Sequence, residues 1–218
     1  MKKSLLILLM LLLLLFPVCA SALPIGTTTL TMTPSSPTAS VKFPSDTYAR
    51  NYYIDYEADF VWDGENIHGE IFCVQDVPGS TSPQLYTFYA IDTSLAGYSN
   101  YLKAAWIAEN YYNATEITKA AAQIAIWEVM FDSGGAYSLN SGNFQSNYAS
   151  NYIAENILSA LSSATIDGTT NWVLAVNSSF QNYLVQNPAP VPEPATLLLL
   201  GTGLIGLAGY GRKKWSAK

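Results

Sequence analysis

The chain has 218 residues, half of them hydrophobic and 12% charged, and its formal net charge is −6. This length fits one ordinary domain together with targeting segments. Between residues 23 and 194, four basic residues face all sixteen acidic ones, a net charge of −12; phosphate backbones would repel so acidic a domain, which argues against nucleic-acid binding.

Residues 1–22 have the pattern of a secretory signal peptide. A basic start precedes an apolar run over residues 4–16, and a small-residue cleavage site ends at Ala22. Cleavage after Ala22 removes Cys19. Lipidation of Cys19 is the less favoured alternative, because a bulky valine precedes it. We therefore expect export through the Sec machinery.

The first exported segments favour strands. Residues 23–47 are rich in Thr, Ser and Pro and predict a flexible arm or an edge strand. Residues 52–62 alternate apolar and polar side chains, which is typical of a half-buried strand. A turn at residues 63–66 leads to a returning strand over 67–74, and residues 84–91 favour another strand.

The chain then becomes helical. Residues 98–111 carry apolar side chains at helical spacing, and Thr115 caps a second helix. A loop rich in Gly, Ser and Asn over residues 132–146 precedes a third helix at about 148–161, and residues 172–176 favour a late strand. Strands followed by helices and a strand predict a single α+β domain.

A spacer and a short hydrophobic segment follow this domain, which we place at residues 48–185. Residues 186–194 include four prolines at alternate positions, which favours a stiff, extended linker. Residues 195–210 are apolar but shorter than the roughly 20 residues that span a bilayer, and a basic cluster follows. We interpret them as a transmembrane helix that holds the chain in the inner membrane until it is processed.

The end of the chain, residues 192–218, resembles the PEP-CTERM sorting signal of Gram-negative bacteria. Pro192, Glu193 and Pro194, the short hydrophobic segment and the basic tail carry the resemblance. It implies cleavage by an exosortase near the Pro-Glu-Pro sequence, then release or attachment at the cell surface, often in strains that make exopolysaccharide. The predicted location is therefore the cell surface or the extracellular space.

Cys73 is the single cysteine that remains after the predicted cleavage, and an unpaired cysteine is unusual in an exported protein. A buried structural thiol is one explanation. A nucleophilic pair with His68 is disfavoured, because residues five apart on one strand point to opposite faces. A third explanation for the lone cysteine involves Gln123, the only polar residue in the apolar stretch 120–127. A buried amide needs hydrogen-bond partners or a modification.

Two segments around these residues resemble the Cys-Gln thioester domains of bacterial surface adhesins. Residues 72–76 resemble the aromatic-Cys segment of that family, residues 122–127 its Gln-x-Ala-Ile-Trp segment, and residues 101–111 the preceding helix. Val-Gln replaces Ile-Glu after the cysteine, and an alanine replaces the threonine before the glutamine. The resemblance implies an internal thioester between the sulfur of Cys73 and the side-chain carbonyl of Gln123.

Such a bond would form when the Cys73 thiolate attacks the Gln123 carboxamide and ammonia leaves, helped by donors to the oxyanion. A pocket lined by Phe72, Trp127 and neighbours such as Phe88 would keep water out. An amine on a partner, such as a lysine, would then take the acyl group. We therefore expect single-use covalent attachment to a surface or matrix partner, without turnover, catalytic residues or a cofactor.

The alternative is a non-covalent structural or exopolysaccharide-associated matrix protein, in which Cys73 and Gln123 are core residues. Asp55, Glu57 and Asp59 share a predicted strand face, which we interpret as solvated in preference to a calcium site, and we expect no metal.

Glu128 and Asp132 lie four residues apart on the second predicted helix. This spacing is compatible with an acid/base pair for sugar hydrolysis, but we expect an exposed helix face.

Overall fold

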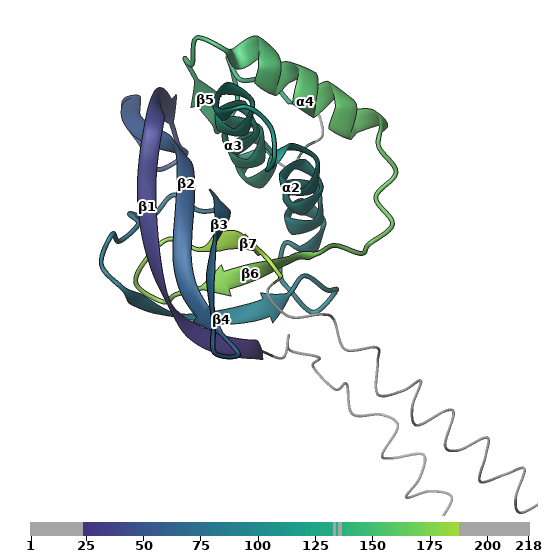
Figure 1. The fold of residues 1–218 in the computed structure, drawn as a ribbon. Helices are drawn as coiled ribbons and strands as arrows, with labels where there is room; N and C mark the ends of the chain where they lie inside the picture. The colour runs from purple at the N-terminus through teal and green to yellow at the C-terminus, as the bar shows by residue number, and fades with distance from the viewer. Residues whose placement is uncertain (1–23, 133, 135–136, 188–218) are drawn as a thin grey trace, which may run out of the picture. The chain divides into compact units, whose positions relative to one another are not determined.

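One antiparallel sheet and three helices make up the part of the chain that the computed structural model describes, residues 24–132, 134 and 137–187 (Figure 1). The α+β class predicted from the sequence is confirmed. The strands are β1 (Pro24–Lys42), β2 (Arg50–Trp62), β3 (Glu65–Cys73), β4 (Gln84–Ala90), β5 (Gln145–Ser146), β6 (Trp172–Val176) and β7 (Tyr183–Gln186). The helices are α2 (Tyr98–Tyr111), α3 (Glu116–Phe131) and α4 (Asn151–Ser163).

The sheet closes on itself. Its strands pair in the order β2, β3, β7, β6, β4 and β1, and β1 also pairs with β2. Leu30 of β1 lies opposite Phe60 of β2 on one side and Gln84 of β4 on the other. The short strand β5 pairs with the far end of β1. Closure therefore occurs through β1, whose first part pairs with β4 and whose second part pairs with β2.

This pairing excludes a flexible arm over residues 24–42. The segment is a strand that β4 pairs over Pro24–Leu30 and β2 over Leu30–Val41, so the sheet begins at Pro24 and not at residue 48. Its prolines obscured it, because proline lacks the N–H that a central strand needs. The structure places a register shift between Ser35 and Thr38, around Pro37, and irregular pairing of this kind tolerates the missing donor.

Strands β5 and β7 were also missed. β7 has only four residues, and its first three, Tyr183, Leu184 and Val185, are all buried, so it lacks the alternation on which the other strand predictions rest. It pairs with β3 and β6 and supplies the neighbour of the strand end that carries Cys73.

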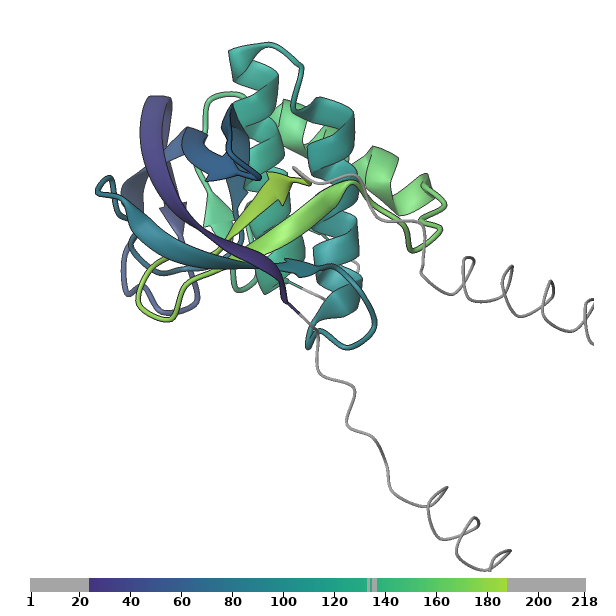
Figure 2. The ribbon, with the colours of Figure 1, turned by 60° about the horizontal axis from the view of Figure 1, so that its bottom comes forward.

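Helix α3 lies against β1, β2 and β3 on one side and contacts both α2 and α4 on the other (Figures 1 and 2). Ten consecutive residues of this helix are buried, from Ala120 to Val129. A helix that is apolar around its whole circumference is stable only with such neighbours. The central position of α3 brings a glutamine side chain into the interior.

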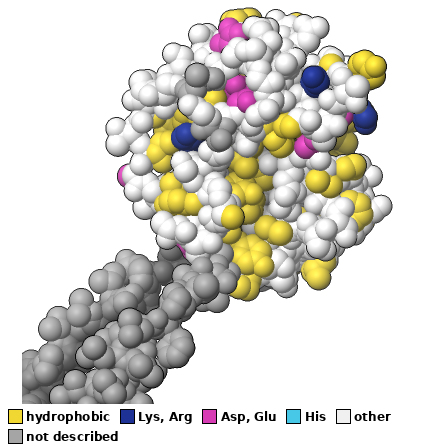
Figure 3. All heavy atoms as spheres, turned by 180° about the vertical axis from the view of Figure 1, so that it is seen from behind, with side chains coloured by type: hydrophobic (Ala, Val, Ile, Leu, Met, Phe, Trp, Pro, Cys, Tyr) yellow, Lys and Arg dark blue, Asp and Glu magenta, His cyan; other side chains and the backbone are white. Residues whose placement is uncertain are grey.

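On the face that Figure 3 shows, uncharged polar and hydrophobic side chains cover most of the area, and charged ones are scattered. None of the helices within residues 24–132 and 137–187 is long and apolar enough to cross a membrane. The predicted signal peptide, and the hydrophobic segment at residues 195–210, lie outside the described residues.

The expectation of an exposed helix face for Glu128 and Asp132 is wrong for Glu128, which is 0% exposed. Its Oε1 accepts a hydrogen bond from the Ser138 N–H at 2.7 Å, and Asp132 accepts bonds from the N–H groups of Asn143 and Phe144 at 2.8 and 2.7 Å. The two carboxyl groups therefore hold the loop that follows α3 and do not converge on one reacting position.

We expect Glu128 to make the domain more stable in mild acid. Burial raises its pKa from 4.5 to about 7, the Ser138 N–H opposes this rise, and Asp132 adds to it. The contribution of the neutral Glu128 side chain to the unfolding free energy is fully present below pH 4.5. It is lost as the pH rises through 7, which lowers the unfolding free energy by up to about 3 kcal/mol. Unfolding free energies at pH 5 and 7.5 should therefore differ less in Glu128→Gln than in the wild type. An equal difference in the two proteins would contradict the assignment.

Candidate functional site

Cys73 and Gln123 lie fifty residues apart in the sequence and meet in the interior. Cys73 is the last residue of β3, opposite Tyr183 of β7, and Gln123 is in the middle of α3. Cys73 is 0% exposed and Gln123 is 1% exposed. The fold thus brings together the two residues that the sequence singled out.

Two reciprocal hydrogen bonds join these residues. The backbone N–H of Cys73 donates to Oε1 of Gln123 at 2.8 Å, and Nε2 of Gln123 donates to the carbonyl oxygen of Cys73 at 2.9 Å. The buried amide is therefore satisfied, as a core glutamine must be. The same geometry aims an N–H donor at the side-chain carbonyl oxygen, where charge would develop if a nucleophile attacked. This donor could not be identified from the sequence, because it is a backbone group.

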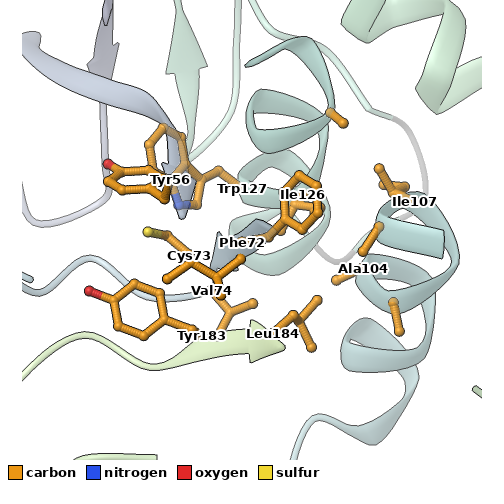
Figure 4. Packing of buried hydrophobic residues seen from close by; sticks show 14 of the residues in the cluster. Tyr56, Phe72, Cys73, Val74, Ala104, Ile107, Ile126, Trp127, Tyr183 and Leu184 are labelled. Atoms are coloured by element: carbon orange, nitrogen blue, oxygen red, sulfur yellow. The ribbon is translucent and has the colours of Figure 1, made fainter. Parts of the chain in front are cut away.

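The sulfur of Cys73 lies on the side of Tyr56 and Tyr183 (Figure 4). Burial raises the pKa of the Cys73 thiol well above its usual value, and a hydrogen bond with the Tyr56 hydroxyl offsets part of the rise. Burial also raises the pKa of both tyrosines, and their proximity to Cys73 adds to this effect. The free thiol is therefore protonated and sheltered beside the Tyr56 hydroxyl, which donates its proton to the backbone carbonyl of Tyr53.

The residues that were predicted to shield the thioester, Phe72, Trp127 and Phe88, do not line one pocket together. Phe72 precedes Cys73 on the strand, so its side chain points to the opposite face, where it packs on Trp172 with ring centroids 5.6 Å apart. Trp127 is 0% exposed and follows Gln123 by one turn of α3.

Phe88 packs elsewhere, on Phe60 and Trp62, with ring centroids 5.5 and 5.2 Å apart. The residues that shelter the sulfur are instead Tyr56 and Tyr183, which could not be identified from the sequence. Their place depends on strand pairing, which the local pattern does not specify.

A pocket of about 630 Å³ reaches the surface on the Tyr56 side of the site. Tyr52, Tyr53 and Tyr56 line it together with Asp46 and residues 75–79, which follow Cys73. Tyr56 thus borders the pocket and also contacts the buried thiol.

His68 takes no part in the site. Its ring lies 2.8 Å from Asp59 and 3.6 Å from Glu57, on the exposed part of the sheet. Asp55 departs from the solvated face predicted for this strand, because it is buried beneath Lys119. Helix α3 covers this end of the strand face, whereas Glu57 and Asp59 lie beyond it. In the described ranges, no group of His, Cys, Asp and Glu side chains is arranged to hold a metal ion.

The fold and this pair of residues define an α+β domain with a buried Cys-Gln pair. The chain matches the PEP-CTERM protein-sorting motif over residues 190–213, which confirms the predicted sorting signal and indicates export and a surface or extracellular location. No curated protein sequence matches the chain.

A solved structure, the N-terminal thioester domain of a surface protein from Clostridium perfringens, is similar with a TM-score of 0.40 and 16% identity. The match covers 73% of this chain and 98% of that chain.

Proposed function

We propose that the domain forms an internal thioester between Cys73 and Gln123 and uses it to attach the protein covalently to an amine-bearing partner on a surface or in the matrix. The observation that carries this proposal is the reciprocal pair of hydrogen bonds between the two residues. It places a carboxamide against the residue that holds the single thiol of the described chain, with a donor already on the carbonyl oxygen.

Bond formation exchanges one leaving group. The Cys73 sulfur bonds to the side-chain carbonyl carbon of Gln123, the C–N bond breaks, and the thiol proton leaves with the nitrogen as ammonia. The Cys73 N–H stabilises the oxyanion, and the Tyr56 hydroxyl lies beside the sulfur that attacks. The dry interior then protects the thioester from hydrolysis, since both residues are buried.

Attachment to a partner breaks the thioester at the same acyl carbon. A primary amine entering through the pocket beside Tyr56 attacks the acyl carbon of Gln123, the carbon–sulfur bond breaks, and the amine's proton restores the Cys73 thiol. The product is a stable amide between α3 and the partner. One partner is captured for each molecule, so the domain is a covalent clamp with a single use and not an enzyme.

Processing gives this clamp its location. The sorting motif at residues 190–213 supports cleavage by an exosortase after transient anchoring in the inner membrane, with release or attachment at the cell surface. A partner in an exopolysaccharide matrix or on another cell would then be within reach.

Methylamine tests the proposal. The purified exported protein should gain one methylamine at Gln123 and, in the same reaction, one thiol that reacts with a maleimide. Gln186→Ala, a change at an exposed glutamine at the end of β7, should leave incorporation unchanged. If neither label appears on the folded wild type, the domain is the non-covalent alternative, in which the two hydrogen bonds serve only to satisfy a core amide.

A further inference from the structure

A cluster of three ionisable side chains lies around Lys119, one helical turn before Gln123. Lys119 of α3 points into the sheet and meets Glu70 of β3 and Asp55 of β2. Its Nζ lies 2.5 Å from Oε2 of Glu70 and 3.4 Å from Oδ1 of Asp55. An amine and two carboxyl groups from three different elements therefore converge beside the Cys73 site.

These three side chains are largely withdrawn from water. Their exposed fractions are 14% for Lys119, 6% for Asp55 and 9% for Glu70. Oδ2 of Asp55 accepts a hydrogen bond from the Ser35 hydroxyl at 3.0 Å, whereas Oδ1 is buried and faces the amine, 3.4 Å from Nζ of Lys119. Burial of this kind favours neutral products over separated charges.

Glu70 is suited to move protons between the other two groups. Burial and a hydrogen bond with Asp55 raise its pKa to about 8, although Lys119 opposes the rise. Burial lowers the pKa of Lys119, but Glu70 and Asp55 outweigh that effect and keep it above its usual value. At neutral pH Glu70 is thus protonated and lies beside the ammonium of Lys119.

We propose that Lys119 and Asp55 form an intramolecular isopeptide bond, with Glu70 as the proton shuttle. This cross-link would fasten α3 to β2, separately from any thioester between α3 and β3. The class of modification is an amide between a lysine amine and an aspartate carboxyl group, with loss of one water.

The atoms balance without an external reagent. Glu70 gives its proton to Asp55 and takes one from the Lys119 ammonium, which leaves a neutral amine beside a neutral acid. The Lys119 nitrogen bonds to Cγ of Asp55, Glu70 carries the second amine proton to the departing hydroxyl, and water leaves. Glu70 ends as it began, protonated and neutral.

The cross-link would transmit mechanical force from α3 to the sheet. Once a partner amine has taken the Gln123 acyl group, the bond between α3 and Cys73 is gone, and α3 carries the partner. An amide from Lys119 to β2 would keep the loaded helix covalently attached to the sheet.

Peptide mapping of the purified exported protein tests this inference. A combined trypsin and chymotrypsin digest should contain a branched peptide that joins Lys119 to Asp55 and is lighter by one water than its two parts. Lys119→Arg keeps the positive charge but should lose the branched peptide, and Glu70→Gln should form it many-fold more slowly. Lys103→Arg, the same change on α2, should retain it.

The wild-type map decides the matter even if a variant does not fold. Linear peptides with an unmodified Lys119 and Asp55 would overturn the proposal, as would a water loss that maps to an Asp-Gly succinimide at residues 63–64 or 167–168. The thioester fails or succeeds separately, because it removes ammonia and is lost in Cys73→Ala, whereas the isopeptide removes water and should persist in that variant.

Discussion

Cys73→Ala and Gln123→Ala are each expected to reduce methylamine incorporation into α3 from one per chain to none. The first removes the sulfur that activates the acyl group, and the second removes the acyl group itself. Alanine at position 123 also leaves the N–H and carbonyl of Cys73 unpaired, at a cost of about 1–3 kcal/mol in unfolding free energy.

Circular dichroism of both variants controls for loss of fold. Cys73→Ala is the cleaner test, because it leaves the two hydrogen bonds from the backbone of residue 73 in place. Incorporation that persisted at Gln123 in this variant would show that the amide is modified without help from the thiol, and the covalent account would be wrong.

Trp127→Ala is expected to lower the unfolding free energy by about 3–5 kcal/mol. Trp127 is 0% exposed. Its ring meets Phe43 edge-on at a centroid distance of 5.0 Å, and Phe144 and Tyr52 at 6.0 and 6.3 Å. Alanine would leave a cavity among these rings, one helical turn from Gln123.

Denaturant unfolding of Trp127→Ala and Trp127→Phe measures this effect. The phenylalanine variant should lose less, because it keeps an aromatic ring and because the indole Nε1 has no hydrogen-bond partner in the described part of the chain. A loss below about 1 kcal/mol in the alanine variant would mean that the interior around α3 is loosely packed.

The sequence predicted the elements whose patterns are local. Residues 98–111 form α2 with the expected bounds, and the apolar stretch around Gln123 is a buried helix. The closure of the sheet was not predictable in this way, since it depends on β1 pairing at once with β2 and β4. Pairing between distant segments leaves little trace in the order of apolar and polar residues.

The residues of the candidate site also differ in how far the local sequence identifies them. Cys73 and Gln123 stood out because each is anomalous where it lies, a lone thiol in an exported chain and an amide in an apolar helix. Tyr56 did not, because a tyrosine on an alternating strand is ordinary until the fold sets it beside the thiol. Lys119, Glu70 and Asp55 come from three elements and become a cluster only when α3 packs on the sheet.

The mass of the untreated wild-type protein tests the thioester most directly. After processing at both ends has been mapped, the exported chain should have lost one ammonia from Cys73 and Gln123, in addition to the one water that a Lys119–Asp55 cross-link removes, and only the ammonia loss should be absent in Cys73→Ala. A wild-type chain that retains the ammonia, with an alkylatable Cys73 after unfolding and an unmodified Gln123 amide, would contradict the account.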